Sequence, residues 1–184
     1  VIDPILQAVK PKAMAHYEQI ENFAISQGAD KVNPWDYSYY DNLLAIKLFN
    51  LDLQKIKVYF PKSKVWEGLL NLIKNKWNLN LVPHNQLTHG QSFKAYLHNQ
   101  FLGEVVVDLD QRDHKMTGAW MDNFLKGGFN STPVVLLSCN FNPQDPYIDL
   151  DEINTLFHEM GHVIHGLVNQ TYYPSQNGTD VGED

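Results

Sequence analysis

The sequence has few cysteines, few basic residues and no long apolar run, and each shortage excludes a class of protein. It has a single cysteine, Cys139, so no internal disulfide can form, and a reducing compartment such as the cytoplasm is expected. Basic residues number 14 against 21 acidic ones, which gives a net charge of -7. This shortage of positive charge argues against nucleic acid as a partner and against a polybasic membrane surface. No apolar run approaches the length of a membrane span, so no membrane partner is expected.

What remains is an ordinary globular composition. Hydrophobic residues make up 43% of the 184 residues and charged residues 19%, which predicts a real core. The length fits one compact domain or a good part of a larger one. The chain opens with "VIDPILQAVK" and lacks an initiator methionine, so we expect its natural N-terminus to lie elsewhere.

Helical periodicity dominates both ends of the chain. "KSKVWEGLLNLIKNKWNL" has Val65, Leu69 and Ile73 on one face, and Ser63 is the expected N-cap. Asp149 and Glu152 resemble a capping box at the start of the last helix. The predicted helices cover residues 4–28, the stretch after Pro34, residues 62–79 and residues 149–168.

The middle of the chain has the alternation that is typical of strands. "QSFKAYLHNQFLGEVVVDLD" predicts two strands around "HNQ", and "TPVVLLSCNF" predicts a buried strand. Residues 56–60 also look extended, whereas "TGAWMDNF" and "KGG" are interpreted as loops. The fold class is therefore α+β, predominantly helical with a small β-sheet.

The stretch "TLFHEMGHVIHGLV" carries the strongest chemical signal. On a helix, His158 and His162 lie on neighbouring turns, close enough for both imidazoles to hold one metal ion. Glu159 points about 60–100° away from them and can instead reach a water held on the metal. This His-Glu-x-x-His pattern is typical of zinc peptidases. The competing interpretation is a helix whose histidines only face solvent or are satisfied in the core.

A catalytic zinc site needs a third protein ligand. His165 lies one turn beyond His162, where three ligands from one straight helix converge poorly. We therefore assign it a role in supporting the metal ligands, a role in lining the substrate site, or none. The acidic residues that follow the motif are Asp180, Glu183 and Asp184. Spacing alone favours Glu183, although it lies close to the end of the chain.

The motifs also resemble a known family. "FHEMGHVIHGL", preceded by "GAWMDNF" and "PVVLLSCNF", is similar to the zinc oligopeptidases of the thimet oligopeptidase, oligopeptidase A and peptidyl-dipeptidase type, peptidase family M3. "NPWDYSYY" and "VYFPKSKVWEGLLNLI" fall in the family's order, so the resemblance covers nearly the whole chain.

The resemblance implies a zincin-like catalytic region of a helical oligopeptidase that admits short peptides through a channel. It implies His158 and His162 as ligands of one Zn2+ per complete active site and Glu159 as general base. It places the third ligand about three residues beyond Asp184. Residues 1–184 are then a partial catalytic domain, truncated just before that ligand.

The predicted function is zinc-dependent hydrolysis of short peptides, in which Glu159 assists attack by a zinc-bound water. The activity is that of a metalloendopeptidase or a peptidyl-dipeptidase, and the fragment alone is expected to be inactive. The alternative is a non-catalytic peptide-binding or structural fragment with an incomplete metal site.

Overall fold

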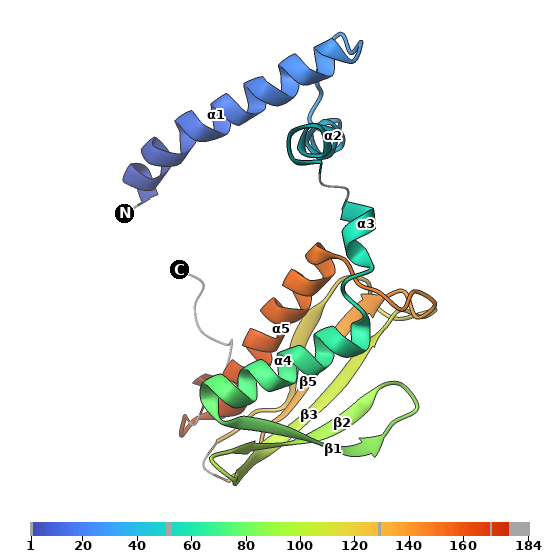
Figure 1. The fold of residues 1–184 in the computed structure, drawn as a ribbon. Helices are drawn as coiled ribbons and strands as arrows, with labels where there is room; N and C mark the ends of the chain where they lie inside the picture. The colour runs from blue at the N-terminus through green and yellow to red at the C-terminus, as the bar shows by residue number, and fades with distance from the viewer. Residues whose placement is uncertain (1, 51–52, 129, 170, 177–184) are drawn as a thin grey trace. The chain divides into compact units, whose positions relative to one another are not determined.

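The computed structural model describes residues 2–50, 53–128, 130–169 and 171–176 (Figure 1). It divides into two compact units, residues 1–53 and 54–184. The first unit contains two helices, α1 (Ile2–Ser26) and α2 (Tyr37–Phe49), which confirm the helices predicted there. They contact each other through stacked rings of Tyr17 and Tyr37, whose centroids lie 5.9 Å apart.

Two further helices lie between α2 and the first strand of the sheet. They are α3 (Leu53–Lys57), which begins at the last residue of the first unit, and α4 (Lys62–Trp77). The prediction of an extended segment over residues 56–60 is wrong, because α3 runs to Lys57 and a turn follows. The N-cap prediction is wrong too. Pro61 holds that position, and its carbonyl accepts hydrogen bonds from the backbone N–H groups of Lys64 and Val65, so α4 begins before Ser63.

The described residues of the second unit form one five-stranded sheet in the order β1-β2-β3-β5-β4. Neighbouring strands are antiparallel, except that β3 and β5 are parallel. His98 and Asn99 join β2 to β3 with φ angles of 49° and 66°, as a two-residue hairpin turn requires. The strands are β1 (Leu79–Gln86), β2 (Gln91–Leu97), β3 (Gln100–Asp110), β4 (Trp120–Leu125) and β5 (Val134–Phe141).

Helices α4 and α5 (Leu150–Val168) both pack on this sheet, and a short 3-10 helix, η1 (Pro174–Gln176), follows α5 (Figure 1). One hydrophobic cluster joins the two helices to the sheet. Its buried members include Leu69, Ile73, Phe93, Val105, Val135, Leu137, Leu156, Met160, Val163 and Leu167. The α+β prediction is confirmed.

Three strands and the final helix lie where the sequence predicts them, but two strands do not. β1 was not predicted, and β4 occupies most of "TGAWMDNF", which was interpreted as a loop. Both are edge strands of the sheet. An edge strand buries fewer of its side chains than a central one, so it lacks the apolar pattern that made β5 visible.

Candidate metal and peptide site

Helix α5 begins where the sequence predicts, at a complete capping box. The Asp149 side chain accepts a hydrogen bond from the Glu152 backbone N–H at 2.8 Å, and the Glu152 side chain accepts one from the Asp149 N–H at 2.9 Å. Two otherwise unpaired N–H groups are thereby satisfied. The negative charges of Asp151 and Glu152 in the first turn also interact favourably with the positive N-terminal end of the helix dipole.

The segment before α4 holds the start of α5 in place. Lys57 Nζ lies 2.8 Å from Asp145 Oδ2 and 3.8 Å from Glu152 Oε2. The hydrogen bond to Asp145 raises the pKa of Lys57, and the same bond lowers the pKa of Asp145. The Ile148 N–H donates to the Phe60 carbonyl at 3.1 Å. The capping box is therefore anchored from outside its own helix.

A buried stripe fixes the rotation of α5 about its axis. Leu156, Met160, Val163 and Leu167 are at most 1% exposed and face the sheet. Phe157, the residue after Leu156, is 37% exposed and lies on the flank of the helix. Packing of the stripe turns the opposite face, which carries the histidines, away from the core.

His158 and His162 converge on that outer face. Their Nε2 atoms lie 3.0 Å apart, and their ring centroids are 4.7 Å apart at an interplanar angle of 80°. Two nitrogens bound at about 2.0–2.1 Å to one tetrahedral zinc ion lie about 3.3 Å apart. The pair therefore fits two ligands of a single ion after a shift of a few tenths of an ångström.

Glu159 lies on the flank of α5 that faces β4. Seven residues span almost two helical turns, so Glu159 and Gly166 share one flank. Gly166 approaches β4 so closely that an added Cβ would lie 2.7 Å from Asn123 Oδ1. Glu159 is half-buried, and its negative charge adds to the effect of burial in raising the pKa of Cys139 to about 12. Glu159 therefore lies on the side of α5 between the histidine face and the buried face, toward β4.

The buried thiol confirms that Cys139 is a core residue, as its apolar surroundings in the sequence indicate. It is 0% exposed on β5. The raised pKa keeps it protonated, which is unsuited to nucleophilic catalysis.

The third metal ligand stays a prediction. Over the described part of the chain, no group of three or more His, Cys, Asp or Glu side chains is placed to hold a metal ion. Asp180, Glu183 and Asp184 lie outside the described residues. His165 is exposed on the outer face of α5, one turn beyond His162, so its role stays open.

β4 is the strand beside the candidate site that the sequence interpretation missed. It pairs with β5 on one side, and no strand formed by the described residues lies on its other side. The loop before it is anchored by Lys115, whose Nζ donates to the carbonyl oxygens of Asp108, Asp110 and Cys139. The signal that could have revealed β4 is the run from Trp120 to Leu125, rich in large side chains, between Gly118 and Gly127.

Comparison with known proteins identifies the family of the chain. Residues 1–184 match the profile of Peptidase family M3. The chain belongs to peptidase family M3. It is 28% identical to oligopeptidase A of Haemophilus influenzae, over 92% of this chain and 27% of that protein.

Two further relatives have a similar level of identity to the chain. The chain is 33% identical to saccharolysin of Saccharomyces cerevisiae, over 84% of this chain and 25% of that protein. It is 31% identical to dipeptidyl carboxypeptidase of Escherichia coli, over 86% of this chain and 25% of that protein. The chain therefore spans about a quarter of the length of these relatives. Across the described residues, no helix is both long and apolar enough to cross a membrane.

Proposed function

We propose that this chain forms part of the catalytic region of a zinc-dependent metallopeptidase that hydrolyses short peptides. The observation that carries the proposal is the 3.0 Å approach of His158 Nε2 and His162 Nε2 on the outer face of α5. Membership of family M3 and relatives named oligopeptidase A and saccharolysin support it. The proposed region is zincin-like, and its activity is that of an endopeptidase or a peptidyl-dipeptidase.

His158 and His162 would hold one zinc ion through their Nε2 atoms. Zinc, when bound, supplies a Lewis acid that polarises a peptide carbonyl and makes water more acidic. A third protein ligand completes such a site. Its candidates are Glu183, Asp184 and a carboxylate beyond residue 184.

Glu159 is the proposed general base. It accepts a proton from the water molecule whose oxygen attacks the carbonyl carbon of the substrate. It then delivers that proton to the amine nitrogen as the C–N bond breaks. Its position on the flank toward β4 supports this role, because a peptide held along β4 would lie beside the carboxylate.

The open edge of β4 is the proposed binding surface for the peptide. An extended peptide can add to a free strand edge through main-chain hydrogen bonds. Although "TGAWMDNF" was interpreted as a loop, most of it forms β4, which is an edge strand and packs against α5. Short peptides are the expected partners, since the net charge of -7 disfavours nucleic acid. A reducing compartment such as the cytoplasm suits the single thiol.

A zinc titration of the 184-residue chain at neutral pH, against a competing chelator, tests the metal site. We expect His158→Ala and His162→Ala each to weaken binding by about a hundredfold, because a direct ligand is lost. His89→Ala, at an exposed position in the β1–β2 turn, is the control and should leave the affinity unchanged. Nanomolar affinity would assign the third ligand to Glu183 or Asp184. Micromolar affinity would place it beyond residue 184, and absence of zinc binding would overturn the proposal.

Hydrolysis of short peptides by the complete protein tests the role of Glu159. We expect Glu159→Gln to lower kcat by about a hundredfold or more while zinc affinity is retained, because general base catalysis is lost. Glu67→Gln, at an exposed position of α4, is the control. Undiminished turnover by Glu159→Gln would remove this residue from the mechanism. Zinc binding without any hydrolysis by the unsubstituted protein would favour a non-catalytic peptide-binding module.

A further inference from the structure

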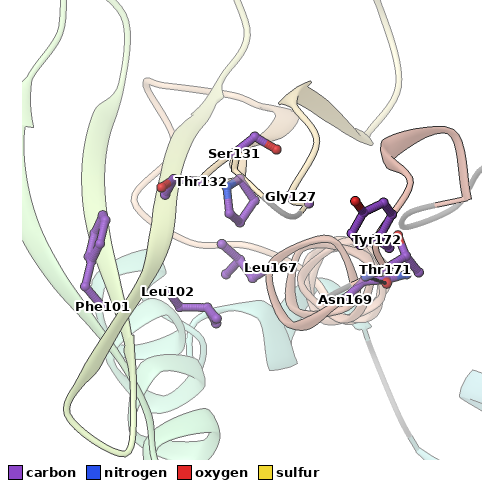
Figure 2. A pocket seen from close by; sticks show the side chains of 11 residues that line it. Phe101, Leu102, Gly127, Ser131, Thr132, Leu167, Asn169, Thr171 and Tyr172 are labelled. Atoms are coloured by element: carbon purple, nitrogen blue, oxygen red, sulfur yellow. Dashed lines mark hydrogen bonds between the residues drawn. The ribbon is translucent and has the colours of Figure 1, made fainter.

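A pocket of about 390 Å³ lies at the C-terminal end of α5 (Figure 2). Phe101 and Leu102 of β3 form one side, and Asn169, Thr171 and Tyr172 form the other. The loop between β4 and β5 contributes Gly127, Gly128 and residues 131–133, and Leu167 lies at the end of the helix. We propose that this pocket is a specificity subsite that accepts a large uncharged side chain of the peptide substrate, best an aromatic one with a hydroxyl group. The inference rests on the function proposed above.

The distance along α5 places the pocket within reach of a bound peptide. Leu167 and Asn169 follow His162 by five and seven residues, which corresponds to about 8–11 Å along the helix axis. An extended peptide advances about 3.3 Å per residue, so the pocket would receive a side chain two or three residues from the scissile bond.

The chain direction of β4 leads toward the wall of the pocket. Gly118 and Ala119, just before β4, line a cavity together with Asp151 and Thr155 near the start of α5. Near the other end of the strand, Asn123 meets Gly166. β4 therefore runs in the same direction as α5, and the chain continues from Leu125 into the loop that forms the pocket wall. A peptide aligned with β4 would reach the pocket in an extended conformation.

The wall of the pocket is held by hydrogen bonds and close packing. Gly128 and Ser131 exchange backbone hydrogen bonds of 3.1 and 3.3 Å, and Ser131 Oγ donates to the Lys126 carbonyl at 2.7 Å. The Pro133 carbonyl accepts a hydrogen bond from the Glu104 N–H at 3.0 Å. A Cβ at Gly103 would lie 2.5 Å from that carbonyl oxygen, so β3 and the loop are in direct contact here. A wall fixed in this way can select by shape.

The lining determines which side chain fits. Phe101, Leu102, Pro133 and Leu167 offer apolar contact, while hydroxyl and amide groups of Ser131, Thr132 and Asn169 lie around them. No Asp, Glu, Lys or Arg belongs to the lining of the described pocket. A charged side chain would lose hydration there without gaining a partner of opposite charge. An aromatic ring with a hydroxyl group matches both kinds of lining.

The test compares peptides that differ at one position two or three residues from the scissile bond, with the complete protein as enzyme. We expect kcat/KM to be at least about tenfold higher for tyrosine than for aspartate or lysine at the responsive position. Thr132→Trp fills the pocket and should abolish this preference. Cleavage of a peptide with alanine at the same position should be retained, because alanine does not need the pocket. Thr88→Trp, at an exposed position in the β1–β2 turn, is the control and should keep the preference.

A binding measurement separates failure of the subsite from failure of the proposed function. N-acetyltyrosine amide is titrated into the 184-residue chain, and binding is followed by the amide NMR signals of Gly127, Ser131 and Thr171. We expect shifts at these residues that Thr132→Trp removes. If the peptides are cleaved but Thr132→Trp keeps the tyrosine preference, or if the amide causes no shifts, the subsite is wrong and the peptidase proposal stands. If zinc is bound and the shifts occur but no peptide is cleaved, the peptidase proposal fails and the pocket is an aromatic-binding site without that role.

Discussion

At the scale of single residues, Cys139 illustrates how burial determines chemistry. Its side chain is fully enclosed in the cluster that joins α5 to the sheet. Burial, followed by the charge of Glu159, raises its pKa from the ordinary value of 9.0 to about 12. The reactive thiolate form is therefore suppressed in the folded protein.

We predict that Cys139 does not react with a thiol reagent at pH 8 until the protein unfolds. Because the folded-state pKa is raised, the thiol contributes stability fully below pH 9 and loses that contribution as pH rises from 9 toward 12. Urea unfolding across this range should show a steeper alkaline loss of stability than in Cys139→Ala. Reaction of the native protein as fast as the urea-unfolded one would contradict the buried assignment.

Residue patterns in the sequence predicted the geometry of α5 well. The capping box, the phase of the two histidines and the flank position of Glu159 are consequences of 3.6 residues per turn, so spacing alone predicts them. The exposure of Phe157 was not predictable from spacing. It depends on how wide a stripe of α5 the sheet covers, and that is a property of the partner strands.

At the scale of elements, two glycines of α5 have opposite roles. Gly161 lies inside the motif "HEMGH", and a glycine inside a helix marks either simple tolerance or close approach of another segment. Among the described residues, nothing lies within 4 Å of a Cβ built at Gly161. At Gly166 an added Cβ meets Asn123 Oδ1 at 2.7 Å and Val135 Cγ2 at 3.4 Å. The close approach therefore occurs at Gly166, one turn beyond His162.

The same substitution at these two sites should change stability in opposite directions. We predict that Gly161→Ala raises the free energy of unfolding by about 0.5–1 kcal/mol, because alanine restricts the unfolded chain and fits open space. Gly166→Ala should lower it by about 1–3 kcal/mol, because the added methyl group pushes α5 away from β4. Urea unfolding of the two variants measures both values. Equal effects would mean that α5 does not pack closely on β4.

Elements whose pattern depends on distant partners were the ones that the sequence did not predict. "KIKVYF" is rich in β-forming side chains, yet its first half completes α3 and Lys57 pairs with Asp145, 88 positions later in the chain. β1 contains Pro83 and five consecutive exposed residues. The β2–β3 hairpin was predictable because both of its strands and its turn are local.

At the scale of the whole molecule, the two units divide the chain unequally. Every member of the main hydrophobic cluster lies between Val65 and Leu167, within the unit 54–184. His158, Glu159 and His162 lie in that unit too. The candidate site is therefore positioned by contacts inside the second unit.

We predict that a polypeptide of residues 54–184 unfolds cooperatively in urea and keeps the zinc affinity of the 184-residue chain within about tenfold. The physical reason is that the buried cluster and the proposed metal-binding helix remain intact. Val105→Asp in the same polypeptide is the control, because it places a charge at a fully buried position of the central strand β3 and should abolish folding. A gradual transition without cooperativity would show that the first unit is needed.

The order of the elements along the chain also has a consequence during synthesis. All five strands, residues 79–141, precede α5, which ends 27 residues after β5 at Val168. At about 5–20 residues per second, the ribosome needs a few seconds more to add this last stretch. Throughout that interval the nascent sheet has no α5 to cover its apolar face. The helix that carries His158 and His162 is added only after the sheet, so the proposed metal ligands are made when the strands that orient them already exist.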